Sequence, residues 1–232
     1  MRIVLVRPPY NGLVVGPSLA MGYLCGYLKR HGHQCSIVDA QRDGLSVDQT
    51  IASTLSLYPD AVGITCLTAF YNNSVTLAKR FKALGIPVLM GGAHPSALPV
   101  ETHNDTGATI FVGESETALL EYANGEHSAL SVIQGVPIKD LDSIGWPEWD
   151  ELKLERYPYA PWGSVAQHAH RAGIATTRGC SFNCTFCASP SFCSRTIRFR
   201  SPKDCVDEIE YLQVKHGIRE IFLVDDNFTA KR

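Results

Sequence analysis

Five short apolar runs are spaced along the first half of the chain. They are residues 3–6, 35–38, 61–65, 87–90 and 109–112. None alternates with polar residues, which is typical of strands that are covered on both faces of a parallel sheet. Stretches with apolar residues at helical spacing lie between them, over residues 19–29, 47–57, 73–84 and 115–122. The pattern predicts an α/β fold over residues 1–125, with a doubly wound, Rossmann-like parallel sheet.

The pattern changes twice further along the chain. Residues 126–165 contain repeated Gly and Pro together with all three Trp, which predicts a linker that packs on a domain surface. Residues 166–232 begin a second unit, in which Ser201 and Pro202 open a helix between strands at 173–177 and 220–224. Two strands and one helix cannot close a barrel. We therefore expect only the N-terminal portion of a (β/α) barrel domain.

Composition and charge narrow the class of protein. The 232 residues are 45% hydrophobic and 19% charged, with a formal net charge of −2. The absence of a basic excess argues against a nucleic-acid or anionic-membrane partner. No apolar run reaches the roughly 20 residues that a membrane span needs, and the start lacks the pattern of a signal peptide. We expect a cytoplasmic protein with reduced thiols.

Three of the eight cysteines, Cys180, Cys184 and Cys187, lie within one eight-residue segment. The spacing Cys-x-x-x-Cys-x-x-Cys, on a loop that follows a strand, brings three thiolates together, and thiolates hold iron–sulfur clusters. Three protein ligands leave one iron of a [4Fe–4S] cluster open for a substrate or cofactor, as a catalytic zinc site keeps one open position. The segment therefore predicts an open-iron [4Fe–4S] site.

Two alternatives for this segment stay open. The pair Cys184 and Cys187 also suits zinc, with Cys193 or a nearby His as a fourth ligand. The second alternative is three unrelated core thiols. The strand before the loop, and the aromatic Phe186 just before the last cysteine, favour the cluster.

With this aromatic residue the segment resembles the Cys-x-x-x-Cys-x-aromatic-Cys signature of the radical S-adenosylmethionine (SAM) superfamily. The resemblance implies that Cys180, Cys184 and Cys187 bind three irons and that SAM chelates the fourth, with Phe186 near the adenine. It also implies that an electron donor such as flavodoxin or ferredoxin supplies the electron that cleaves SAM to a 5′-deoxyadenosyl radical.

Two acidic residues, Asp225 and Asp226, follow the last predicted strand. The same resemblance implies that they receive the amino group of SAM, since carboxylates suit a bound ammonium. A turn that leads into a helix start is the alternative for these two residues.

Polar and conformationally permissive residues follow two strands of the first unit. Thr65 and Leu67 follow the third strand, and Gly91, Gly92 and His94 follow the fourth. Ligands of doubly wound sheets bind at the carboxyl ends of the strands, and adjacent glycines let a flat ligand lie against the backbone. This set resembles the cobalamin-binding domain that precedes the radical domain in one large subgroup. The resemblance implies that the tail of cobalamin threads between the strands beside these residues.

The loop after the first strand departs from many cobalamin-binding domains. Residues 7–12 read Arg-Pro-Pro-Tyr-Asn-Gly and lack the Asp-x-His-x-x-Gly histidine that ligates cobalt. We expect base-off cobalamin without that ligand, and a degenerate domain that binds nothing is the alternative.

Three polar residues near the strand ends have a structural alternative to cofactor binding. His94 suits a role in holding its own turn as well as it suits contact with the cofactor. Glu114 and Glu116 suit carboxylates that complement a helix dipole.

Together these features predict a cobalamin-dependent radical SAM enzyme that acts on a small molecule, either through the 5′-deoxyadenosyl radical or by methyl transfer. The substrate pocket of such an enzyme comes mostly from later barrel strands, so these residues do not select the reaction. The alternative is a non-catalytic cobalamin- or metal-binding module, including a zinc-stabilised one. The iron, sulfide, zinc and cobalt content of the protein distinguishes the two.

Overall fold

The structure is a computed structural model that describes residues 1–12, 16–126, 131–157, 171–188, 192 and 195–230. Its largest element is a six-stranded parallel sheet with the order β2-β1-β3-β4-β5-β6. The strands are β1 (Arg2–Arg7), β2 (Gln34–Asp39), β3 (Ala61–Thr65), β4 (Val88–Gly91), β5 (Thr109–Val112) and β6 (Val132–Gln134). The predicted Rossmann-like sheet is confirmed. The strand order reverses between β1 and β3, and ligands of such sheets bind at that switch point.

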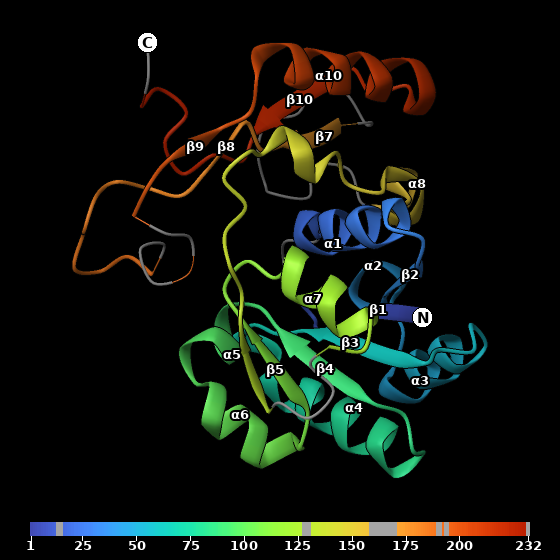
Figure 1. The fold of residues 1–232 in the computed structure, drawn as a ribbon. Helices are drawn as coiled ribbons and strands as arrows, with labels where there is room; N and C mark the ends of the chain where they lie inside the picture. The colour runs from blue at the N-terminus through green and yellow to red at the C-terminus, as the bar shows by residue number, and fades with distance from the viewer. Residues whose placement is uncertain (13–15, 127–130, 158–170, 189–191, 193–194, 231–232) are drawn as a thin grey trace.

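Helices cover both faces of this sheet (Figure 1). One face packs against α1 (Leu19–Arg30) and α7 (Glu116–Ala123), and the other against α3 (Val47–Leu55) and α4 (Tyr71–Ala83). Strand β1 shows why its apolar run does not alternate: Ile3 belongs to the buried cluster on the α1 face, and Val4 to the cluster on the α4 face. Burial on both faces therefore accounts for the continuous apolar pattern.

Short helices without a sequence prediction fill the connections. They are α2 (Ala40–Asp43), α5 (Ala93–Ala97), α6 (Pro99–Thr106) and α8 (Trp149–Leu152), together with the 3₁₀ turns η1 (Thr68–Phe70), η2 (Asp142–Ile144) and η3 (Leu154–Arg156). Helices α5 and α6 both lie between β4 and β5; Pro95 lies in the first turn of α5, and Pro99 is the first residue of α6, where the missing N–H costs no helical hydrogen bond. None of the helices within the described residues is long and apolar enough to cross a membrane.

The segment that was predicted as a linker contributes to the first unit. Strand β6 pairs in parallel with β5; it is only three residues long and buries only Ile133, which is too weak a pattern to predict a strand. The following residues pack on α1. A Cβ atom at Gly26 of α1 would lie 2.7 Å from the carbonyl oxygen of Trp146, so a glycine is needed for this close approach. The boundaries of the linker, 126–165, remain a prediction.

The second unit is smaller. It contains β7 (Arg171–Ile174), β8 (Thr177–Arg178), β9 (Arg198–Phe199), α10 (Pro202–His216) and β10 (Glu220–Leu223). Strands β7 and β10 pair in parallel, and β8 and β9 pair antiparallel. In Figure 1 these elements lie on the α1 side of the large sheet, and the loop after β8 extends to the left.

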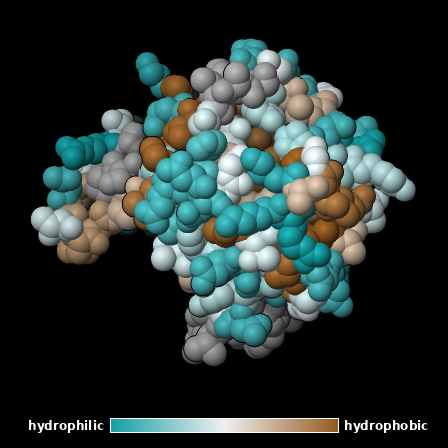
Figure 2. Space-filling model, turned by 90° about the horizontal axis from the view of Figure 1, so that it is seen from below, coloured by the Kyte–Doolittle hydropathy of each residue, from teal (hydrophilic) through white to brown (hydrophobic). Residues whose placement is uncertain are grey.

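Polar side chains cover most of the face seen from below, with smaller apolar patches between them (Figure 2). The two units share one apolar core on the α1 side of the sheet. Ala172 and Ile174 of β7 and Leu212 of α10 belong to the same buried cluster as Ile3 and Leu28. The second unit is therefore placed against the sheet by side-chain packing.

Candidate functional site

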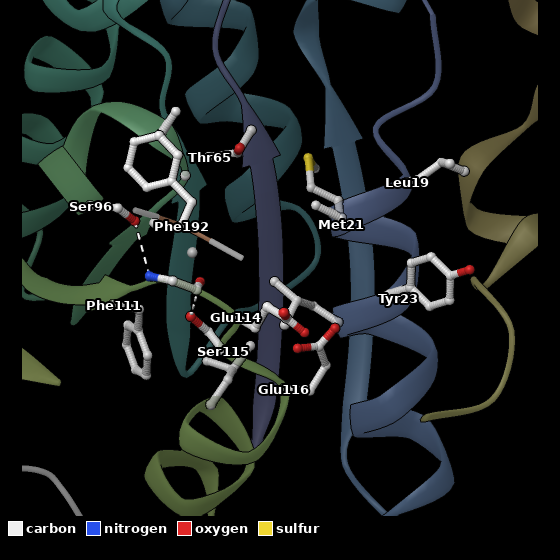
Figure 3. A pocket seen from close by; sticks show the side chains of 18 of the residues that line it. Leu19, Met21, Tyr23, Thr65, Ser96, Phe111, Glu114, Ser115, Glu116 and Phe192 are labelled. Carbon is white, nitrogen blue, oxygen red and sulfur yellow. Dashed lines mark hydrogen bonds between the residues drawn. The ribbon is translucent and has the colours of Figure 1, made fainter. Parts of the chain in front are cut away.

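A cavity of about 430 Å³ lies where the two units meet. It is bounded by the carboxyl ends of β3, β4 and β5, by α1 and the start of α7, and by residues of the second unit (Figure 3). Its apolar lining includes Leu5, Leu19, Met21, Ile64, Leu89, Met90, Phe111 and Leu119. A mostly apolar hollow with a few polar groups, at the switch point of a parallel sheet, is the usual form of a cofactor site.

Three of the residues predicted at the strand ends line this cavity: Thr65, Gly91 and Gly92. Gly92 has a φ of +108°, and a Cβ atom there would lie 2.7 Å from the carbonyl oxygen of Cys66. The position therefore accepts only glycine, and without a side chain there the backbone packs closely against Cys66 at the rim of the cavity. Leu67 does not line the cavity, and 46% of it is exposed to solvent.

His94 is buried but lies outside the cavity lining. Its Nδ1 is 3.1 Å from Oγ1 of Thr68, its ring packs on Tyr71 with 4.0 Å between centroids, and its backbone N–H donates to the carbonyl of Cys66. These contacts support the turn-holding role rather than cofactor contact. The ring nitrogen Nε2 is buried without a hydrogen-bond partner among the described residues.

The two acidic residues after β10 have different positions. Asp226 lines the cavity. Asp225 instead accepts hydrogen bonds at Oδ1 from the backbone N–H and hydroxyl of both Thr176 and Thr177, at 3.0 and 2.9 Å for Thr176. These bonds hold the chain between β7 and β8, which is why the predicted strand at 173–177 is split into two. Asp225 thus orders the residues that lead to the cysteine loop.

The three predicted metal ligands lie on the loop that follows β8. Their thiols are free: Cys180 is half-buried, and Cys184 and Cys187 are exposed. Within the described part of the chain no group of three or more His, Cys, Asp or Glu side chains has an arrangement that could hold a metal ion, so the sulfurs are not gathered around one point. Phe186 is 91% exposed and lies outside the cavity lining.

The donor set nevertheless fits an iron–sulfur cluster. Three free thiols lie on one short loop, and the N–H of Cys187 donates to the carbonyl of Cys184 at 3.1 Å, so the last two ligands share one turn. Gly179, directly before Cys180, lines the cavity. The loop therefore starts at the rim of the site. Cys193, the fourth ligand in the zinc alternative, lies outside the described residues.

A group of charged residues in the site was not assigned to it from the sequence. Arg178 donates to Glu116 at 2.6 Å and to Glu114 at 3.0 Å, and Arg198 also pairs with Glu114. Glu116 does lie in the first turn of α7, as predicted, but the two carboxylates also bind the arginines on either side of the cysteine loop. The sequence offered one signal for these ion pairs. An arginine flanks the cysteine loop on each side, and a guanidinium group that becomes buried needs a carboxylate partner.

Comparison with known families matches both units of the chain. Residues 13–123 match the family described as B12 binding domain, and residues 174–232 match the radical SAM superfamily. The chain combines a B12-binding domain with part of a radical SAM domain. Its B12-binding domain supplies the sheet edge of the cavity, and its radical SAM part supplies the cysteine loop and Asp226.

Curated relatives of this radical SAM protein include cyclases and methyltransferases. The anaerobic magnesium-protoporphyrin IX monomethyl ester cyclase of Rubrivivax gelatinosus is 32% identical over 100% of this chain and 46% of its own length. An uncharacterized methyltransferase of Pyrococcus horikoshii is 28% identical over 100% of this chain and 55% of its own length. The chain thus spans about half the length of these relatives.

Solved structures of the family share the fold. The radical SAM methyltransferase TsrM from Kitasatospora setae, with tryptophan substrate and a SAM analog bound, aligns with a TM-score of 0.72 and 18% identity over 99% of this chain and 49% of that one. The cobalamin-dependent radical SAM enzyme OxsB, with aqua-cobalamin and SAM bound, aligns with a TM-score of 0.71 and 18% identity over 100% of this chain and 34% of that one.

Proposed function

We propose that this chain is the cofactor-binding part of a cobalamin-dependent radical SAM enzyme that modifies a small molecule. The observation that carries the proposal is the composition of one cavity. Thr65, Gly91 and Gly92 line it from the B12-binding domain, and Gly179 and Asp226 line it from the radical SAM part. Residues that were predicted for two different cofactors therefore border one space.

In this proposal the sheet edge holds cobalamin. The apolar lining suits the face of a flat ring and excludes water from it. Gly92 places no side chain at the mouth of the cavity, and Thr65 offers a hydroxyl at the end of β3. The loop over residues 7–12 provides no histidine for cobalt, so we expect cobalamin to bind without a ligand from that loop.

The cysteine loop holds the cluster in the same proposal. Cys180, Cys184 and Cys187 provide three thiolates, which leaves an open iron for SAM. Asp226 faces the cavity and accepts a hydrogen bond from an ammonium, and Asp225 fixes the chain that leads into the loop. Phe186 is solvent-exposed, so an adenine contact requires the loop to fold inward when it closes on its ligands. When bound, the cluster and SAM supply the radical or methyl-transfer chemistry.

Anaerobic reconstitution tests the proposal. The chain is incubated with iron, sulfide and cobalamin, and its iron, sulfide, zinc and cobalt are then measured, with EPR spectra of the reduced protein before and after SAM. We expect about four irons and four sulfides per chain, one cobalt, and a spectrum that changes with SAM.

Other results would separate the alternatives. Cobalt without iron would indicate a cobalamin-binding module that is not a radical enzyme. One zinc without sulfide would contradict the cluster and favour a zinc-stabilised domain. Iron and sulfide without a response to SAM would remove the open-iron site. Identification of the small-molecule substrate then requires activity assays on the loaded protein, with methyl transfer and ring formation as the reactions that the relatives suggest.

A further inference from the structure

The cysteine loop leaves the fold and returns to it at one place. Strands β8 and β9 pair antiparallel at the base of the loop, and their register places Arg178 directly opposite Arg198. Arg178 is two residues before the first cysteine of the motif. Whatever fixes these two arginines therefore fixes the base of the loop.

Both arginines are held by carboxylates of the B12-binding domain. Arg178 donates through Nη1 to Oε1 of Glu116 at 2.6 Å and to Oε2 of Glu114 at 3.0 Å. Arg198 donates through Nη1 to the same Oε2 of Glu114 at 3.1 Å and through Nη2 to its other oxygen. Glu114 thus bridges the two arginines, and Glu116 adds a second bond to the one nearer the cysteines.

These ion pairs are shielded from solvent. The side-chain exposures of Arg178, Arg198, Glu114 and Glu116 are 17%, 8%, 10% and 6%. Burial opposes the charge on Arg178, but the carboxylates, Glu116 foremost, outweigh it and raise the pKa of this guanidinium above its ordinary value. Its guanidinium carbon also lies 4.6 Å from the ring centroid of Tyr23. Removal of one partner would leave an unpaired charge in a poorly solvated place.

The same residues form a wall of the cavity. Glu114, Glu116, Arg178 and Tyr23 all line it, and Figure 3 shows both carboxylates between α7 and α1, beside Tyr23. Their ion pairs thus connect the cofactor cavity to the base of the cysteine loop.

We propose that Glu114 and Glu116 are positioning residues, which hold Arg178 and Arg198 so that the cysteine loop is set against the cavity for SAM binding at the cluster. The SAM part rests on the proposed function. The carboxylates act on the cysteine loop through the arginines that they bind.

The first test needs no cofactor. In the double variant Glu114→Gln/Glu116→Gln, amide hydrogen exchange of residues 177–188 should become about tenfold faster, because the loop base opens more often. The matched control is Asp43→Asn in α2 of the first unit, which also removes a shielded carboxylate from a buried arginine, here Arg42 at 2.7 Å. It should leave exchange of the loop unchanged. Unchanged exchange in the double variant, or an equal increase in the control, would overturn the proposal.

The second test uses the reconstituted protein. The double variant should keep its iron and sulfide, since all three cysteines remain, but should need about tenfold more SAM for half of the EPR change. Arg178→Lys keeps one positive charge but loses the fork that bonds both carboxylates, so it should fall between the double variant and the wild type. A normal SAM response despite faster exchange would reduce the ion pairs to a purely structural role and refute positioning. If the wild-type protein bound no cluster, the proposed function would be contradicted. The exchange test would still show whether Glu114 and Glu116 hold the base of the loop.

Discussion

The two parallel β-structures of this protein are buried to very different degrees. Strand β1, in the B12-binding domain, buries residues 3–6 almost completely. Strand β10, in the radical SAM part, buries none of its residues fully, and Leu223 and the following Val224 are 40% and 43% exposed. The first sheet has helices on both faces, whereas β7 and β10 form a pair that rests on the core of the first unit. Regular hydrophobic layers thus stabilise the first unit, and contacts with its neighbour stabilise the second.

In the second unit, buried polar contacts supplement the apolar packing. Glu208 of α10 is fully buried and accepts hydrogen bonds from Nε1 of Trp149 at 3.0 Å and from Arg200 at 2.5 Å. Burial raises the pKa of Glu208 even though Arg200 opposes this shift. Such a group adds little net stability, but it penalises other orientations strongly, because a misplaced helix would leave a charge unpaired. The second unit is therefore oriented by directional contacts.

The largest expected effect separates cluster binding from folding. In the triple variant Cys180→Ala/Cys184→Ala/Cys187→Ala, iron and sulfide should be lost completely after reconstitution, because alanine offers no ligand. The unfolding midpoint of the apo-protein should stay the same, since none of these thiols belongs to the buried core. Metal analysis and thermal unfolding check both statements. Cys205→Ala, at a buried cysteine of α10, is the control that should retain iron; retention of iron in the triple variant would contradict the site.

A pair of leucines tests the difference between the two strands. Leu89 of β4 is 2% exposed and Leu223 of β10 is 40% exposed. Leu89→Ala should lower the free energy of unfolding by about 2–5 kcal/mol, because it removes a buried side chain from the apolar cluster on the α1 face of the sheet. Leu223→Ala should lower it by less than about 1 kcal/mol, since little apolar area is lost. Urea denaturation gives both values, and equal losses would show that β10 is as well packed as β4.

Gly92→Ala tests the rim of the cavity. With φ +108° and ψ −175°, Gly92 lies in a region that costs an L-residue about 1–3 kcal/mol, and the added Cβ would meet the carbonyl oxygen of Cys66 at 2.7 Å. The rim must shift, so we expect cobalamin affinity to fall about tenfold, as measured by spectral titration. Gly44→Ala is the control for a positive φ away from the cavity, because Gly44 is in the left-handed α region, at φ +62°, and no atom lies within 4 Å of the added Cβ. Equal affinities in both variants would exclude the rim from cobalamin binding.

The smallest effect concerns pH and the end of α10. Burial lowers the pKa of His216 below its ordinary value of 6.5, although Asp150 opposes the shift. Because its pKa is lower in the folded state, His216 binds a proton more readily in the unfolded chain. The neutral ring therefore favours folding above pH 6.5, and this contribution to the free energy of unfolding is lost as the pH falls through the folded-state pKa. Between pH 7 and pH 5 the wild type should lose slightly more stability than His216→Gln. Denaturation curves at several pH values test this, and parallel losses would contradict it.

Local signals predicted a large part of this structure. Continuous apolar runs located β1 to β5 to within one or two residues, because strands buried on both faces cannot tolerate polar positions. Strand β6 escaped prediction, since three edge residues with one buried side chain carry no such pattern. Thr65, Gly91, Gly92 and Asp226 were expected at strand ends and do line the cavity, whereas Leu67, His94, Phe186 and Asp225 do not. Side-chain direction depends on neighbours that are distant in the chain.

The sequence by itself determined the fold class, the doubly wound order of elements and the three candidate thiolate ligands, because each depends on residues that are close in the chain. Tertiary structure alone decided that the sheet edge and the cysteine loop border one cavity, and that Glu114 bridges Arg178 and Arg198 across 64 and 84 positions of sequence. The physical reason is burial. A carboxylate and a guanidinium look like ordinary surface groups in a sequence, and only their removal from water makes them dependent on each other.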